Sequence, residues 1–336
     1  MYDGAANQPE LGRTRVLIVR LGAMGDVIHA LPAAASLAAS FPGAEIVWVI
    51  DPKWAALLEG NPHVHRVIPF NRRDWSSVRR TFHELRASKF NFAVDFQGLI
   101  KSALLATIAR PEKIYGFARG EARETAATWC YSTLATTTSI HIVDKNLELA
   151  ALAGARTTVI EFPIPSGSAE GELPEGPFVL ANPLAGWASK QWPLAYYSRL
   201  AEALSVPLVV NGPPSAESEL RKVRGARVHL SGLPGLIDAT RRATAVVGVD
   251  SGPLHLAAAL GKAGVAIYGP TDPSRNGPYG GSIEVLRAAK ALTTYKRGAE
   301  IAESMRAVTP EEVMTALLRA VGDSLARPQS AAEAGL

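Results

Sequence analysis

The sequence predicts an α/β protein in which two parallel sheets, each covered by helices on both faces, form two separate domains. Three observations support this fold class. The chain has 336 residues, a length typical of two domains. Continuous apolar strands alternate with helical segments in both halves, as in buried parallel sheets. A segment rich in Pro, Gly and Ser, residues 163–177, lies between the halves and indicates a domain boundary.

The first half begins with an apolar strand at residues 15–21, which leads through a glycine turn into a helix over residues 26–40. Further strands are predicted at three short apolar runs, residues 44–50, 65–70 and 91–97. Helical patterns are found at residues 54–60, 76–89, 99–110 and 146–155. Residues 116–142 are polar and irregular, and a connection of this length in a compact domain is often functional.

The second half repeats the alternation. Apolar strands are predicted at residues 178–184, 207–211, 227–231, 245–251 and 263–269. Helices are predicted between them, at residues 194–204, 215–223, 236–243 and 253–260. A last helix over residues 309–325 has Thr309 as its N-cap, Pro310 in its first turn and Glu312 closing a capping box. The tail, residues 326–336, is predicted to be disordered.

Composition excludes several classes of protein. Apolar residues make up 47% and charged residues 20%, the balance of an ordinary globular enzyme. The single cysteine, Cys130, excludes an intrachain disulfide and fits a packed thiol in a reducing compartment. No signal peptide and no apolar run of roughly 18 residues is present, so we expect a cytoplasmic protein that can touch the membrane surface.

Charge is uneven along the chain. Residues 13–130 hold 16 Lys and Arg against 10 Asp and Glu, which favours an anionic partner for the first half, although solvated helix faces explain most of these charges. No zinc-finger spacing, aromatic RNA-binding motif or long basic run indicates nucleic acid. No HxxH, DxD or cysteine cluster predicts a metal site, and no Gly-x-Ser-x-Gly elbow predicts a hydrolase.

Four strand ends carry residues suited to chemistry, at the edge where open α/β sheets bind ligands. The first is "GAMGD", residues 22–26. Gly22 and Gly25 allow close backbone approach, but the third glycine of a dinucleotide fingerprint and a Walker lysine are missing. Asp26 would repel a pyrophosphate at this helix N-terminus. It is either a helix cap, which spacing alone favours, or a general base at the cleft.

The second strand end is "VGVDSGPLHLAAALG", residues 247–261. Asp250 can accept hydrogen bonds from hydroxyls, and His255 lies one turn into the helix. The free N–H groups after Ser251 and Gly252 can hold a phosphate or a sugar hydroxyl. The structural alternative is a capped helix with a histidine facing the core, but the combination of residues favours a functional site.

The third strand end, "ANPLAGWASKQWP" at residues 181–193, places Ser189 and Lys190 in a loop before a helix. A lysine there is either a point charge for a diphosphate or an ordinary exposed side chain. The fourth, residues 268–281, is a turn-rich loop that either closes over a ligand or only connects two elements.

These motifs together resemble a known family. "VLIVRLGAMGDVIHALPA", "DFQGLIKSA", "ARE" at residues 122–124, "SKQWP" and "GVDSGPLHLAAALG…YGPTDP" are similar to the bacterial ADP-heptose:lipopolysaccharide heptosyltransferases of glycosyltransferase family nine, above all to the heptosyltransferase I branch. The resemblance extends from residue 15 to residue 320. It implies the GT-B fold, two Rossmann-like domains that face each other across a cleft. The implied units are an acceptor-binding domain, a nucleotide-sugar-binding domain and a helix that packs back on the first domain, at residues 13–165, 176–305 and 309–326.

The resemblance also implies roles for individual residues. Asp26 matches the catalytic base, and Lys190 matches a catalytic lysine on the diphosphate. The matched donor-binding positions are Ser189, Lys190, Glu217, Asp250, Ser251, Gly252 and His255, with Glu219 as the alternative to Glu217 at the nucleoside. The matched acceptor-binding positions are Gly22, Gly25, Arg123, His141 and Lys145.

The implied reaction is the inverting transfer of L-glycero-D-manno-heptose from ADP-heptose to a Kdo residue of the lipopolysaccharide inner core, with no metal and no cofactor. The implied partners are ADP-heptose, an anionic Kdo-bearing lipid A and the inner face of the inner membrane, without nucleic acid. Two alternatives stay open: another family-nine transferase, or a catalytically silent nucleotide-sugar-binding protein. A silent protein has no need of a carboxylate at position 26. The missing glycine and Asp26 itself disfavour a nicotinamide dehydrogenase.

Overall fold

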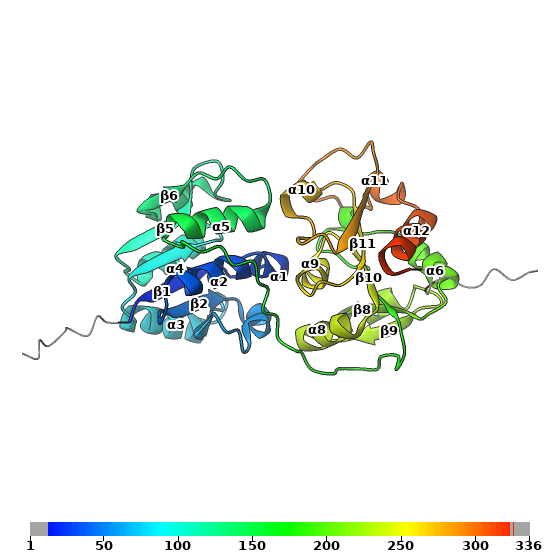
Figure 1. The fold of residues 1–336 in the computed structure, drawn as a ribbon, viewed down its shortest axis with the longest axis horizontal. Helices are drawn as coiled ribbons and strands as arrows, with labels where there is room; N and C mark the ends of the chain where they lie inside the picture. The colour runs from blue at the N-terminus through cyan, green and yellow to red at the C-terminus, as the bar shows by residue number, and fades with distance from the viewer. Residues whose placement is uncertain (1–12, 323–324, 326–336) are drawn as a thin grey trace, which may run out of the picture.

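The computed structural model describes residues 13–322 and residue 325, and it shows two α/β units side by side (Figure 1). The first sheet has six parallel strands in the order β3-β2-β1-β4-β5-β6, the strand order of a Rossmann fold. Its strands are β1 (Arg15–Val19), β2 (Glu45–Ile50), β3 (Arg66–Pro69), β4 (Phe92–Asp95), β5 (Lys113–Phe117) and β6 (Thr133–Ala135).

Helices cover both faces of this sheet. One face packs against α1 (Met24–Ile28), α2 (Leu31–Ser40) and α5 (Ile142–Leu152). The other packs against α3 (Trp75–Ala87), α4 (Ile100–Ile108) and the 3-10 helix η2 (Thr125–Cys130), whose free thiol Cys130 is half-buried at that core. A second 3-10 helix, η1 (Pro52–Leu58), follows β2. Sequence and structure agree on apolar strands buried between two helix layers.

The second sheet repeats the same order, β12-β11-β10-β7-β8-β9, again with parallel strands. Its strands are β7 (Val179–Asn182), β8 (Leu208–Gly212), β9 (Arg227–Leu230), β10 (Ala245–Val249), β11 (Gly264–Tyr268) and β12 (Ile283–Arg287). The long helices around it are α6 (Leu194–Ala203), α8 (Leu233–Arg242), α9 (Gly252–Ala259) and α12 (Pro310–Val321). Shorter ones are η3 (Ala188–Lys190), η4 (Pro214–Ala216), α7 (Glu217–Leu220), α10 (Pro273–Asn276) and α11 (Glu303–Arg306).

Several predicted elements differ in detail. The helix expected over residues 26–40 is two helices, α1 and α2, because Pro32 lies at the start of the second one, where its missing N–H costs nothing. The irregular stretch 116–142 contains the end of β5 and the short strand β6. None of β5, β6 and the edge strand β12 was predicted from the sequence. The segment expected to separate the domains falls between α5 and β7, in a stretch without helix or strand.

The expected position of the last helix is wrong. α12 has the predicted capping box, in which Thr309 and Glu312 bond to each other's backbone N–H groups. However, α12 packs on α6, β11 and β12 of the second domain, at the end of the molecule far from the first domain (Figure 1). Its apolar stripe, which includes Val313 and Leu317, belongs to the second core. The ion pair between Arg319 and Glu284 of β12, at 2.5 Å, adds to this docking. The predicted tail after residue 325 lies outside the described residues.

The two domains meet through α1 and α9, which approach closely because glycines lie at the contact. A Cβ atom on Gly25 would come within 2.4 Å of His255, and one on Gly252 within 2.8 Å of Met24. Both glycines therefore serve the contact between the domains. This contact brings the carboxyl ends of β1 and β10 to opposite sides of one cleft, because α1 and α9 directly follow these strands.

Candidate active site

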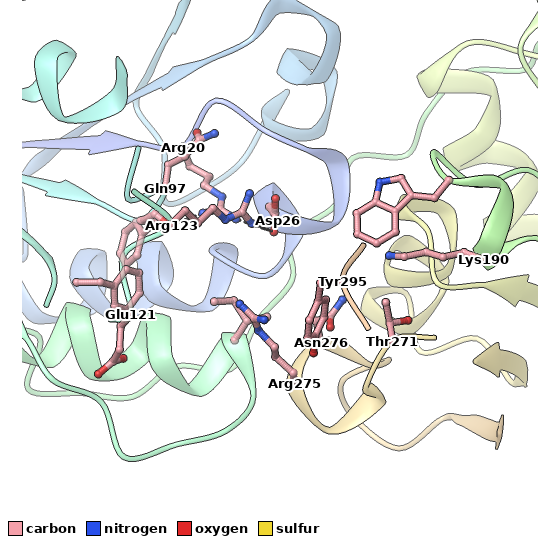
Figure 2. A pocket seen from close by; sticks show the side chains of 14 residues that line it. Arg20, Asp26, Gln97, Glu121, Arg123, Lys190, Thr271, Arg275, Asn276 and Tyr295 are labelled. Atoms are coloured by element: carbon pink, nitrogen blue, oxygen red, sulfur yellow. Dashed lines mark hydrogen bonds and ion pairs between the residues drawn. The ribbon is translucent and has the colours of Figure 1, made fainter. Parts of the chain in front are cut away.

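A cleft of about 500 Å³ lies between the domains at the carboxyl ends of both sheets (Figure 2). The first domain contributes residues that follow β1, β4 and β5, among them Arg20, Asp26, Gln97, Glu121 and Arg123. The second domain contributes residues that follow β7, β11 and β12, namely Trp187, Lys190, Thr271, Arg275, Asn276 and Tyr295. The two predicted catalytic residues, Asp26 and Lys190, therefore line one cleft from opposite sides.

Asp26 is the third residue of α1, and its two carboxylate oxygens have different partners. Oδ2 accepts a hydrogen bond from the N–H of Ala23, 3.1 Å away, so the side chain does cap the helix. Oδ1 lies 2.7 Å from Arg20 and 2.8 Å from Arg123. The side chain is 21% exposed and lines the cleft. Asp26 therefore both caps α1 and faces the cleft.

The two arginines decide the charge of Asp26. Burial raises the pKa of this carboxyl, but the charges of Arg20 and Arg123 outweigh burial and hold the pKa well below its ordinary value of 3.8. Asp26 is therefore ionised at neutral pH and ready to accept a proton. It is also a weaker base than an unpaired aspartate for as long as both arginines stay in contact.

Arg20 is a site residue that the sequence analysis missed. Its side chain is 1% exposed, and it pairs with Asp26 and donates to the backbone carbonyl of Phe96. A lone arginine at the end of the apolar run "VLIVRL" was the available signal, because a buried guanidinium needs a partner anion.

The predicted acceptor residues fall into two groups. Arg123 lines the cleft and is 46% exposed, so it can reach a ligand. Lys145 lines a small hollow beside the cleft and pairs with Glu121 at 3.4 Å. His141 caps α5 through Val143 N–H, and its Nε2 lies 3.2 Å from the carbonyl of Gly277 in the second domain.

Gly22 and Gly25, also predicted for the acceptor, are not among the lining residues of the cleft. A Cβ atom on Gly22 would lie 2.7 Å from the indole of Trp54, and Gly25 faces His255. The motif "GAMGD" thus places Asp26 through tight packing of α1, and its glycines serve that packing.

On the donor side, Lys190 lies 2.5 Å from Asp250 and 4.3 Å from the centre of the Trp187 ring. Asp250 also accepts from Thr271 at 2.7 Å and lies 3.8 Å from His255. Although burial raises the pKa of Asp250, its contacts with His255 and Lys190 hold the pKa below the ordinary value. The result is a buried, ionised carboxylate with a lysine fixed above it.

Two predicted serines have free hydroxyls. The buried Oγ atoms of Ser189 and Ser251 have no hydrogen-bond partner in the structure. Ser251 is the N-cap of α9 but its side chain makes no capping bond. A buried hydroxyl without a partner costs free energy, and a ligand that bonds to it removes that cost. The N-terminus of α9 beside Ser251 is suited to a phosphate.

Glu217 and the alternative Glu219 do not line the cleft. Glu217 pairs with Arg221 at 2.6 Å and Glu219 pairs with Lys222, in both cases along α7. Both carboxylates are more than two-fifths exposed. Neither lines a described hollow in this conformation.

A separate hollow of about 380 Å³ also lies between the domains and includes Pro253, in the first turn of α9, in its wall. Apolar side chains such as Trp54 of the first domain and Leu184 of the second form much of its wall. Two amides, Asn182 and Asn211, supply polar groups, and Asn211 is fixed by Ser231 at 2.8 Å. An apolar slot with a few fixed amides suits a flat heterocycle. Sequence reasoning identified none of these residues as ligand-binding.

Among residues 13–322 no group of three or more His, Cys, Asp and Glu side chains is arranged to hold a metal ion. Within the same range, no helix is both long and apolar enough to cross a membrane. The positive charge in the cleft comes from side chains of the protein, including Lys190 and Arg275.

Comparison with known proteins gives the chain's relatives. The family model of glycosyltransferase family 9 (heptosyltransferase) matches residues 78–303. Lipopolysaccharide heptosyltransferase 1 of Pseudomonas aeruginosa is 31% identical over 300 residues, which cover 80% of this chain and 82% of the relative. The protein of the same name from Escherichia coli K12 is 30% identical, covering 82% of this chain and 94% of the relative.

Solved structures of glycosyltransferases have a fold similar to that of this chain. The E. coli heptosyltransferase WaaC with ADP matches with a TM-score of 0.74 and 25% identity, and the match covers 91% of this chain and all of that one. A family 9 glycosyltransferase from Veillonella parvula has a TM-score of 0.76 at 20% identity, covering 91% of this chain and 98% of that one, which supports the fold alone. Two Rossmann-like sheets around a cleft are the GT-B fold. The chain belongs to glycosyltransferase family 9, and it is a glycosyltransferase.

Proposed function

We propose that the enzyme transfers L-glycero-D-manno-heptose from ADP-heptose to a hydroxyl of a Kdo residue in the lipopolysaccharide inner core, with inversion and without a metal ion. One observation carries the proposal: a base, Asp26, and a fixed cation, Lys190, line the same cleft from opposite domains. The names of the relatives supply the sugar, since these proteins are lipopolysaccharide heptosyltransferases, and a WaaC structure holds an ADP-heptose analogue.

In the proposed complex, the second domain binds the donor. The adenine enters the 380 Å³ hollow, where the side-chain amides of Asn182 and Asn211 can bond to it. The diphosphate lies between Lys190 and the start of α9, where Ser251 and Gly252 offer hydrogen-bond donors. Asp250 holds Lys190 in place by their ion pair. Contacts to the heptose from His255 are possible only after the α1–α9 contact opens, because Gly25 covers its ring.

The first domain binds the acceptor. Arg123 can pair with the carboxylate of Kdo, and Lys145 adds a second cation on the same domain. Burial lowers the pKa of His141, so that residue offers an uncharged ring to the acceptor. When Arg123 turns to the acceptor, Asp26 keeps only Arg20, so its basicity rises as the substrate arrives. The acceptor oxygen then forms a bond to the anomeric carbon as the bond to ADP breaks. The hydroxyl proton passes to Asp26, and the electron pair of the broken bond leaves with ADP.

The acceptor also fixes where the enzyme works. Because Kdo is attached to lipid A, we propose that the protein acts at the cytoplasmic face of the inner membrane and touches that membrane peripherally. ADP-heptose and the Kdo-bearing lipid are its small-molecule partners in this proposal, and nucleic acid is not among them.

Mass spectrometry of products tests the function. The purified enzyme is given a panel of ADP-sugars and UDP-sugars together with a Kdo-bearing lipid acceptor. We expect a product whose mass increases by one heptose, and only with ADP-heptose. A product from another sugar would identify a different family 9 transferase, and tight donor binding without any product would identify a silent binding protein.

Turnover is expected to persist in excess EDTA. The reason is that Lys190 and the N-terminus of α9 lie where they can balance the charge that builds on the departing diphosphate. The initial rate with and without the chelator is the measurement. Loss of turnover that Mg²⁺ or Mn²⁺ restores would overturn this account of the leaving group.

Replacing Arg123 with Ala is expected to raise the acceptor KM, because one charge-assisted contact contributes about 1.5–3 kcal/mol, or roughly 10- to 150-fold. The same change removes one cation from Asp26, so the pKa of Asp26 rises. The acid limb of the pH profile of kcat/KM should therefore move to higher pH. Arg119→Ala is the matched control, since Arg119 is an exposed arginine of the same connection that does not line the cleft. An Arg123→Ala enzyme with weaker ADP-heptose binding and an unchanged acceptor KM would contradict the domain roles.

A further inference from the structure

The first domain has an outer surface that the reaction does not use. Helices α3 and α4 and the 3-10 helix η2 lie next to one another on one face of the sheet. In α3 the buried residues Ser77, Thr81 and Leu85 recur every four positions, so they define the inward side of the helix. The residues on the opposite, outward side include Trp75, Arg79, Phe82 and Arg86.

Large exposed apolar side chains lie on all three of these neighbouring helices. Trp75 is 85% exposed and Trp129 of η2 is 77% exposed, values that are unusual for tryptophan. Phe82 of α3 and Ile100 and Leu104 of α4 are each between two-fifths and one-half exposed. Ile100 and Leu104 are four residues apart, opposite the buried side of α4. We call these five residues, with Arg79, Arg86 and Lys101, the α3–α4 face.

The α3–α4 face is also strongly basic. Residues 71–89 contain six Lys and Arg against two Asp and Glu. One of the acidic residues, Asp74, bonds to the first turn of α3 as its N-cap, which leaves the outward cations without carboxylate partners on their own helix face. Arg86 lies 5.7 Å from the centre of the Phe82 ring, so cations and aromatic rings alternate on the surface.

The α3–α4 face borders the acceptor end of the cleft. The N–H of Ile100 donates to Glu124 at 2.7 Å, and Glu124 is next to Arg123 in the chain. Gln97, which lines the cleft, lies three residues before α4. A ligand that reaches Arg123 from this side therefore passes the start of α4.

We propose that the α3–α4 face docks on a bilayer that contains anionic lipid. Tryptophan and leucine side chains suit the boundary between headgroups and acyl chains, and arginines suit the lipid phosphates. A second copy of the chain fits less well, since a two-fold interface would bring this basic face against itself. The inference rests on the proposed function for one point only, that the acceptor is anchored in this bilayer.

Vesicle sedimentation tests the inference with the full chain. The vesicles are phosphatidylcholine with or without phosphatidylglycerol, and they carry no acceptor. We expect binding to the anionic vesicles. Arg79→Glu with Arg86→Glu should weaken that binding at least about tenfold, because each cation near an anionic surface contributes roughly 1 kcal/mol. Trp75→Ala with Trp129→Ala should weaken it by about tenfold as well.

Matched controls use exposed residues of the second domain. Arg224→Glu with Arg227→Glu reverses two exposed charges there, and Leu292→Ala removes a side chain that is 85% exposed. All variants should keep the wild-type melting temperature and the wild-type kcat on a deacylated, water-soluble acceptor. These readouts separate a docking defect from misfolding.

Several results would overturn the inference. The first is that the wild type binds neutral and anionic vesicles equally well. The second is that the control variants lose as much vesicle binding as the variants of the α3–α4 face. The third is that the wild type does not bind vesicles at all. A dimer that Trp75→Ala with Trp129→Ala dissociates, without vesicle binding, would assign the face to a second copy. If the wild type binds anionic vesicles but makes no product with the soluble acceptor, the proposed function fails and the docking surface stands.

Discussion

Asp26→Asn is expected to lower kcat at least a hundredfold, because loss of a general base typically costs on the order of 10²–10⁴-fold in rate. Asparagine keeps an oxygen that can accept from the N–H of Ala23, so the capping bond at 3.1 Å is retained. It cannot accept the acceptor's proton. The measurement is kcat with ADP-heptose and a Kdo-bearing acceptor, beside the affinity for ADP, which should stay unchanged.

The same substitution has a structural cost that the capping argument alone does not foresee. Arg20 is 1% exposed and has Asp26 as its ion-pair partner. Neutralising one member of a buried ion pair typically destabilises a protein by about 3–5 kcal/mol, although the partly exposed Asp26 places this pair at the lower end. The melting temperature of Asp26→Asn should therefore fall, and kcat must be measured well below it.

Asp74→Asn is the matched control for Asp26→Asn. Asp74 caps α3 by accepting from Ser76 N–H at 2.9 Å, without an arginine in contact and without lining the cleft. The control should keep its kcat and almost all of its stability. If Asp26→Asn retained most of its kcat, Asp26 would be only a cap and a partner of Arg20, and the proton would have to leave by another route.

Much of the fold follows from local sequence. Central strands such as β1 and β10 are apolar runs buried on both sides, and their pattern is unmistakable. Three strands were missed. Two of them, β6 and β12, lie at sheet edges, where part of each strand is exposed and the apolar pattern is weak. The third, β5, is an inner strand, but its sequence KIYGF begins with an exposed lysine and contains a glycine, so it lacks a continuous apolar run. The apolar stripe of α12 predicts a docked helix, but no local pattern states which of two similar domains will cover it.

The site was predictable where a residue follows a strand in a recognisable motif, as Asp26, Lys190 and Asp250 do. Residues whose role depends on a distant partner were not. Arg20 matters because it meets Asp26, and Arg275 lines the cleft because its loop reaches across from the second sheet. Glu217 stays a prediction: the resemblance assigns it to the nucleoside, and in the structure its carboxylate pairs with Arg221 on α7.

Lys190→Ala is expected to lower kcat with ADP-heptose on the order of 10²–10³-fold, the usual effect of losing one donor that stabilises charge in the transition state. The lysine is held by Asp250 at 2.5 Å and by the Trp187 ring, so little reorganisation is needed when the diphosphate departs. Lys262→Ala is the control, because the Lys262 ammonium donates to the carbonyl of Arg241 on the same domain and does not line the cleft.

Stability and kcat after loss of the Lys190–Asp250 ion pair distinguish a catalytic lysine from a merely structural one. The lowered pKa of Asp250 means that its carboxylate stabilises the folded state above the ordinary pKa of 3.8, and that this contribution is lost as the pH falls. Without Lys190 the pKa of Asp250 rises, so Lys190→Ala should lose stability at neutral pH but little at acidic pH. Lys190→Ala with Asp250→Asn removes the unpaired charge and should recover much of that stability. If the double variant also recovered kcat, the lysine would serve only to neutralise Asp250; if kcat stays low in a stable protein, the lysine acts on the departing diphosphate.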